Sequence, residues 1–158
     1  MAAAVALAAS AGAAGCADGD PPRPADGGLS GEVVRVADGD TIRVRLDSGP
    51  EERVRYIGVD TPERSGAECF AEQATAFNAR LVAGREVRLV LDAEERDRYG
   101  RLLAYVYAGE VFVNAELVRE GYAQPLTVPP NVRFEDRFAR LARDARLAGR
   151  GLWASCSS

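Results

Sequence analysis

The sequence predicts an α+β fold, in which five strands form a small closed barrel and three α-helices pack against it. Two patterns indicate this. Short segments alternate β-branched and polar residues, as half-buried strands do. Three other segments repeat apolar residues every three or four positions, as amphipathic helices do. With 158 residues, the chain is long enough for one core but too short for a second catalytic domain.

The strands are expected in two groups, on either side of the first helix. Turn residues separate the first three, at Asp38-Gly39-Asp40 and at Asp47-Ser48-Gly49-Pro50. The five predicted strands are 32–37, 41–47, 53–59, 86–91 and 102–107.

Each of the three helices has a predicted end or cap. The first ends at Gly84, the second begins at Asn114 as its N-cap and ends at Gly121, and the third ends at Gly149. Apolar stripes on the first and third helices are expected in the core: Phe70, Ala74, Phe77 and Leu81, then Phe134, Phe138, Leu141 and Ala145. This order of elements fits a five-stranded barrel of the oligonucleotide/oligosaccharide-binding (OB) type.

Composition excludes several classes of site. The chain has no histidine, so zinc sites and histidine acid/base chemistry lose their usual participant. The net charge of −4 argues against a protein that coats nucleic acid through bulk positive charge. All 20 basic residues are arginine, which reflects the codon bias of a GC-rich genome and also suits bidentate phosphate binding.

The N-terminus is expected to direct export. Residues 1–15 are almost wholly small or apolar, too short and too weakly apolar to span a bilayer, and are interpreted as a signal peptide. Ala13-Ala14-Gly15-Cys16 resembles a bacterial lipobox, with cleavage before Cys16 and lipidation of its thiol; a positively charged n-region is missing. An ordinary signal, with Cys16 incidental, is the alternative. The chain would then be secreted, not held at the outer face of the membrane by a lipid anchor.

The remaining predictions about domain organisation follow from composition and cysteine number. Residues 16–30, rich in Pro, Gly, Asp and Ala, are interpreted as a tether, 31–154 as a monomeric folded domain, and 155–158 as a tail. If Cys16 carries lipid, Cys69 and Cys156 remain. In an exported chain such a pair is expected to form a disulfide, and two free thiols are the alternative.

Three short motifs carry the chemistry: Asp38-Gly39-Asp40-Thr41, Val59-Asp60-Thr61-Pro62-Glu63 and Arg98-Tyr99-Gly100-Arg101. Each is weak alone, because Asp-Gly and Asp-Thr-Pro are common in turns. Together they place carboxylates at the ends of two predicted strands, with arginines nearby. Carboxylates can hold a hard divalent cation, and arginines can bind phosphate oxygens.

These motifs resemble those of the staphylococcal (micrococcal) nuclease family of calcium-dependent nucleases, and the resemblance runs from about residue 31 to 153. It implies that Ca²⁺ is held by the carboxylates of Asp40 and Asp60 and by the main-chain carbonyl of Thr61. Asp38 would steer the Asp40 turn without contacting the metal. It also implies that Glu63 activates or orders the attacking water.

The resemblance assigns Arg55 and Arg101 to phosphate binding. Arg55 and Asp60 are five positions apart, so simple strand alternation would point them to opposite faces. A bulge or a strand end is needed to bring them together. From the sequence alone, a solvated strand arginine is the alternative for Arg55.

The substrate-binding residues depart from the family pattern. Leu126 and Val128 stand where relatives often have tyrosines that pack against the nucleotide, and Arg98 and Tyr99 are expected beside them. The resemblance as a whole implies endonucleolytic cleavage of DNA and RNA with low sequence specificity. A barrel that binds single strands without cutting them is the alternative, and a lipoprotein that binds protein partners is a third.

Overall fold

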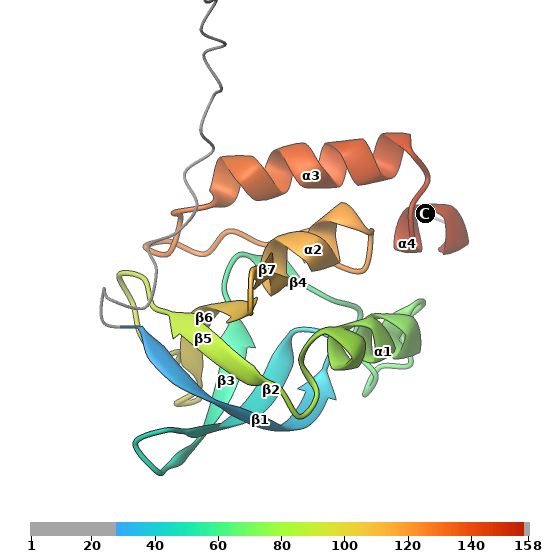
Figure 1. Cartoon of the computed structure of the whole chain (residues 1–158). Coiled ribbons are helices and arrows are strands. Elements are labelled where there is room, and N and C mark those ends of the chain that lie inside the picture. The colour runs from blue at the N-terminus through green and yellow to red at the C-terminus, as the bar shows by residue number, and fades with distance from the viewer. Residues whose placement is uncertain (1–27, 157–158) are drawn as a thin grey trace, which may run out of the picture.

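The computed structural model describes residues 28–156 (Figure 1). The predicted signal peptide, Cys16 and nearly all of the predicted tether lie outside the described residues. The first strand, β1 (Leu29–Asp38), begins two residues before the domain start that the sequence suggested.

Five strands form the barrel: β1, β2 (Thr41–Leu46), β3 (Glu51–Tyr56), β5 (Glu86–Val90) and β6 (Leu102–Ala108). They pair antiparallel in the order β3-β2-β1-β5-β6, and a parallel pairing of β3 with β6 closes the ring. The two-residue strand β7 (Val111–Phe112) pairs antiparallel with β6, while β4 (Val59–Asp60) pairs with β8 (Gln124–Pro125). The predicted five-stranded α+β barrel is confirmed.

Three helices of seven residues or more accompany the barrel: α1 (Ala71–Val82), α2 (Val113–Arg119) and α3 (Glu135–Leu147). A single further turn, α4 (Leu152–Ser155), follows α3. Helix α1 lies at one side of the barrel, and α2 lies between the barrel and α3 (Figure 1). The barrel interior is filled by aliphatic side chains of alternating strand residues, including Ile42, Val44, Val54 and Leu89.

Two details of the predicted helices were wrong. Asn114 does not cap α2: the N-cap is Phe112, and Asn114 lies inside the helix with no exposed surface. Its amide instead donates to Ile57 O and accepts from Val106 N, so it joins α2 to the barrel. The buried stripe of α1 is also rotated, because Ala71, Ala74, Asn78 and Val82 are buried, whereas Phe77 and Leu81 are only partly covered.

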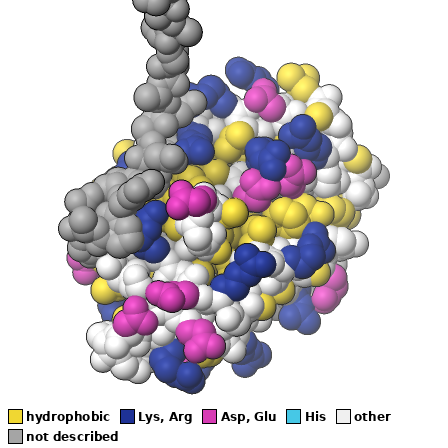
Figure 2. Space-filling model, viewed as in Figure 1, with side chains coloured by type: hydrophobic (Ala, Val, Ile, Leu, Met, Phe, Trp, Pro, Cys, Tyr) yellow, Lys and Arg dark blue, Asp and Glu magenta, His cyan; other side chains and the backbone are white. Residues whose placement is uncertain are grey.

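The surface shows no large area of one charge in the view of Figure 2. Arginines and carboxylates are interspersed there, and hydrophobic side chains gather in a band across the middle. In the part of the chain that the structure describes, no helix is long and apolar enough to cross a membrane.

Candidate active site

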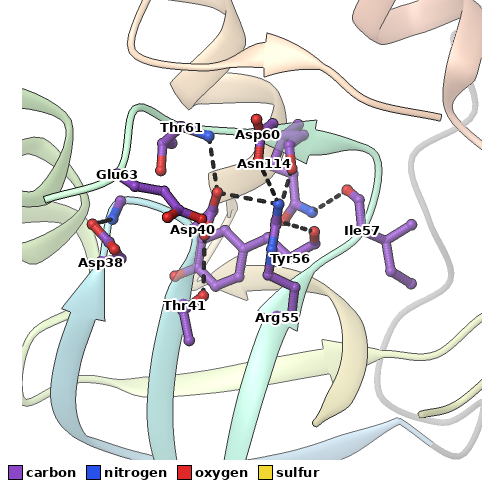
Figure 3. A network of polar contacts seen from close by, with 12 residues as sticks. Asp38, Asp40, Thr41, Arg55, Tyr56, Ile57, Asp60, Thr61, Glu63 and Asn114 are labelled. Atoms are coloured by element: carbon purple, nitrogen blue, oxygen red, sulfur yellow. Dashed lines mark hydrogen bonds and ion pairs between the residues drawn. The ribbon is translucent and has the colours of Figure 1, made fainter. Parts of the chain in front are cut away.

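The site begins where the β1–β2 turn meets the chain after β4. Asp40 is 6% exposed, and its Oδ2 accepts a hydrogen bond of 2.8 Å from Thr61 N. Its Oδ1 accepts from Thr41 Oγ1 at 3.0 Å. Gly39 is required between the two aspartates, because a Cβ there would lie 2.6 Å from Thr61 Oγ1. The Asp-Gly-Asp-Thr and Asp-Thr-Pro motifs are therefore packed directly together (Figure 3).

Arg55 connects the two aspartates. Its Nη2 lies 2.8 Å from Asp60 Oδ1 and 3.3 Å from Asp40 Oδ2. Its Nη1 donates to Tyr56 O and Val59 O, so the guanidinium also spans the turn between β3 and β4 (Figure 3). Strand alternation would point Arg55 and Asp60 to opposite faces, but it does not apply here, because β3 ends at Tyr56 and the chain turns before Asp60.

The turn also depends on a glycine. Gly58 has φ +77°, a conformation that L side chains rarely adopt, and a Cβ there would lie 2.5 Å from Phe138 of α3. Helix α3 therefore packs against the turn that brings Asp60 to Arg55.

Asp60 is the accessible carboxylate of the pair, with a side chain that is 53% exposed against 8% for Asp40. Partial burial raises the pKa of Asp60; Arg55 opposes this shift, and the carboxylates of Asp40, Glu63 and Glu68 add to it. Such a cluster of like charges is stabilised by a cation.

Glu63 extends from the loop after β4 beside Asp40 (Figure 3). Its position depends on Glu68, whose Oε2 accepts a hydrogen bond of 2.9 Å from Glu63 N. Ser65 Oγ donates to Glu63 Oε2 at 3.3 Å. Because the Glu63 side chain is exposed, its carboxylate can reach a water molecule at the mouth of the site.

Asp38 accepts hydrogen bonds from Gly39 N and Thr75 Oγ1, so it fixes the turn from the side of α1.

The residues present fit a hard divalent cation at an open site. The available donors are oxygens: the Asp40 and Asp60 carboxylates and the carbonyl of the adjacent Thr61. Within residues 28–156 no group of three or more acidic or cysteine side chains could hold a metal ion. A cation here would therefore have to complete its shell with water or phosphate oxygens, which suits Ca²⁺ or Mg²⁺ and not a closed structural zinc site.

Arg101 is held on the other side of the site by Asp97. Arg101 Nε donates to Asp97 Oδ2 at 2.7 Å, and the main-chain N–H groups of Arg101 and Tyr99 both donate to Asp97 Oδ1. Burial acts to raise the pKa of Asp97, but these hydrogen bonds outweigh it and leave the pKa below its ordinary value. Tyr99 is 63% exposed, and the guanidinium groups of Arg98 and Arg101 lie 4.8 and 5.4 Å from the centre of its ring.

Arg55 and Arg101 line one cleft of about 450 Å³. The parallel pairing of β3 and β6 brings them together, because Val54 pairs with Leu102. The same cleft contains every residue that the sequence suggested for substrate binding: Arg98, Tyr99, Leu126 and Val128. Leu126 and Val128 are 44% and 57% exposed, so they give the cleft an apolar wall in addition to its arginines.

Some supporting residues were missed by the sequence patterns. Asn78, fully buried, accepts from Tyr56 OH at 2.9 Å and donates to Asp38 O at 3.1 Å, so α1 supports the turn that carries Asp40. The signal was a polar residue among the apolar positions of a helix. Asp97 and Glu68 gave no comparable signal, because both are ordinary acidic residues of turns.

The predicted pairing of Cys69 with Cys156 is present as a disulfide with a Cα–Cα distance of 5.9 Å. It joins the residue two positions before α1 to the end of the described chain. Neither cysteine lines the cleft.

Comparisons with known proteins show the family of this chain. Residues 53–155 match the family described as "Staphylococcal nuclease homologue". The chain is 37% identical over 128 residues to the thermonuclease of Staphylococcus hyicus, which covers 78% of this chain and 75% of that protein.

Two further relatives show the same level of similarity. The thermonuclease of Staphylococcus intermedius is 38% identical over 125 residues, covering 77% of this chain and 74% of the relative. The endonuclease YncB of Bacillus subtilis is 37% identical over 126 residues, covering 76% of this chain and 59% of the relative. The chain therefore belongs to the staphylococcal nuclease family.

Proposed function

We propose that this protein is a calcium-dependent endonuclease that hydrolyses phosphodiester bonds of DNA and RNA with low sequence specificity. The observation that carries the proposal is the position of Arg55. Its guanidinium lines the cleft with Arg101 and also contacts both candidate metal-binding carboxylates. Asp40 and Asp60 do not themselves line the cleft, but a phosphate there would lie within reach of two arginines, one of which contacts both carboxylates.

The roles follow from charge and access. Asp40, Asp60 and the Thr61 carbonyl would hold Ca²⁺, which supplies a Lewis acid for the phosphate and a template for the attacking water. Arg55 and Arg101 would bind the phosphate oxygens, where negative charge accumulates during attack. Glu63, exposed beside Asp40, would orient the water or accept its proton.

Low sequence specificity fits the composition of the cleft. Its arginines recognise phosphate, which every nucleotide has, and its apolar wall of Leu126 and Val128 offers no hydrogen bond to a base edge. We expect weak binding of the free nucleotide, because aliphatic side chains replace the stacking that aromatic rings would supply.

A barrel that binds single strands without cutting them is the rival function. Asp40, Asp60 and Glu63 argue against it, because carboxylates beside a phosphate site repel the ligand unless a cation lies between them.

The disulfide supports export to an oxidising compartment, as does the signal-like N-terminus. Anchoring through Cys16 and a monomeric state remain parts of the proposal.

The test is digestion of single-stranded DNA, duplex DNA and RNA with calcium, and again after chelation. Cleavage is expected only with calcium. Asp40→Ala is expected to abolish it, and Arg101→Ala to lower the rate about 100-fold or more, since one such donor contributes roughly 3–4 kcal/mol to the transition state. Undiminished cleavage in excess chelator would refute the metal requirement. A loss below about tenfold in Arg101→Ala would refute the role of that arginine.

A further inference from the structure

Three arginines lie side by side on the outer face of the barrel, on neighbouring strands. Arg35 of β1, which lies between two shifts of register in that strand, is the partner of Arg43 of β2, and Arg43 pairs with Arg53 of β3. All three are exposed. Side chains directly opposite one another on antiparallel strands have Cβ atoms about 5 Å apart, so the three positive charges form a continuous row. We call these residues the arginine row.

The arginine row is poorly neutralised. Arg43 has one ion pair, with Glu51 at 4.0 Å, and Glu51 lies closer to Arg45, at 3.0 Å. No ion pair or hydrogen bond involves the side chains of Arg35 and Arg53 among the residues that the structure describes. Like charges directly opposite on paired strands destabilise a sheet. In a chain with a net charge of −4, such a row has no evident value for folding.

The row also leads directly to the candidate active site. Arg53 lies two residues before Arg55 on β3, so both side chains point to the same face, about 7 Å apart along the strand. On the neighbouring strand, Val54 pairs in parallel with Leu102. Continued by one residue beyond the paired segment, this register would set Arg53 beside Arg101. The row therefore begins next to both arginines of the cleft and runs away from it across β2 and β1.

We propose that the arginine row binds the phosphates of the substrate strand where that strand leaves the cleft. A cleft of about 450 Å³ has room for the reacting phosphate and the nucleosides on either side of it, so nucleotides further along the strand must lie on the surface beside the cleft. The row offers guanidinium groups over about 10 Å, a distance that covers two or three phosphates of one strand. Beyond the row, Glu32 and Glu51 flank Arg45 on the same face and end the positive region.

This proposal rests on the proposed function only for the identity of the ligand, and it predicts length dependence. A dinucleotide fills the cleft without reaching the row, whereas a 12-nucleotide strand reaches both. The plot of log affinity against log salt concentration has a negative slope. Loss of two phosphate contacts makes this slope less steep by about 1.4 for a single strand, which corresponds to affinity that is about 25-fold weaker at 0.1 M salt.

The experiment compares the Arg35→Gln/Arg53→Gln variant with the parent and with an Arg140→Gln/Arg143→Gln control. The control makes the same charge change on α3, outside the cleft lining. Binding of a 12-nucleotide DNA strand to the full chain is measured by fluorescence anisotropy, in chelator, at several salt concentrations. Melting temperature and calcium-dependent cleavage of a dinucleotide are measured alongside.

The row variant is expected to bind the 12-nucleotide strand about 25-fold more weakly, with the lower salt slope, and to keep its melting temperature and its rate on the dinucleotide. The control is expected to change each quantity little. Equal binding by the row variant and the control would overturn the proposal, and so would an equal loss on the dinucleotide and the longer strand. If the parent cleaves nothing with calcium while the row variant still loses binding, the proposed function fails and the row remains a binding surface.

Discussion

Replacing Arg55 with glutamine is expected to make the protein bind calcium more tightly while slowing its cleavage of DNA. In the structure the Arg55 guanidinium lies 2.8 Å from Asp60 and 3.3 Å from Asp40, where it neutralises the carboxylates that would hold the metal. A calcium ion bound about 2.4 Å from these oxygens would lie about 4–5 Å from the guanidinium. Calcium and Arg55 therefore compete for the same two side chains.

The magnitude follows from that distance. A divalent ion and a unit charge 4.5 Å apart repel by about 2 kcal/mol in a water-like dielectric, which is a lower limit here because Asp60 is half-exposed but Arg55 is only 14% exposed. Removing the guanidinium should tighten calcium binding by about 30-fold or more. The same substitution removes a phosphate ligand, so the cleavage rate should fall by about 100-fold or more. A gain in metal affinity with a loss of rate is the signature of this arrangement.

The assay is isothermal titration of calcium into the protein without substrate. Arg101→Gln is the matched control, because Arg101 pairs with Asp97 and does not contact Asp40 or Asp60. Weaker or unchanged calcium binding in Arg55→Gln would show that Arg55 organises the carboxylates and does not compete with the metal. Equally tighter calcium binding in Arg101→Gln would show that the effect comes from the change in net charge alone. Either result would refute the competition between Arg55 and calcium.

Three other measurements test separate parts of the molecule. Replacing Cys69 and Cys156 together with serine opens a loop of 87 residues and should lower the free energy of unfolding by about 4–5 kcal/mol in the chain-entropy model. Calcium-dependent cleavage at mild temperature should persist; an unchanged melting temperature would contradict the expected stabilisation. Because the pKa of Asp60 is raised, calcium affinity should be complete above that pKa and be lost as the pH falls through it, at a higher pH than an ordinary aspartate would give. Calcium titrations at a series of pH values check this, and a loss confined to the ordinary range would count against it. Leu126→Tyr with Val128→Tyr should tighten nucleotide binding by about 1–3 kcal/mol per stacked base, and unchanged affinity would show that these positions do not face the base.

Local patterns were sufficient for the elements of the fold. The strands on either side of α1 were predicted because side chains alternate with period two, and each was found within a few residues of its predicted bounds. The helices followed from period 3.6, although the phase of α1 was misplaced. Asn78 explains the misplacement. It is fully buried because it forms hydrogen bonds with Tyr56 and Asp38, but a method based on hydrophobic residues alone assigns a polar residue to the surface.

The sequence by itself determined which residues could make a phosphate and metal site, because carboxylates, arginines and a glycine turn have that chemistry wherever they lie. It also determined that Cys69 and Cys156 could pair. Only the tertiary structure decided that Arg55 and Asp60 meet, since the turn at Gly58 cancels the alternation of the strand. It alone aligned Arg35, Arg43 and Arg53, because the register of three strands depends on hydrogen bonds between distant segments, and no local pattern of residues records that register.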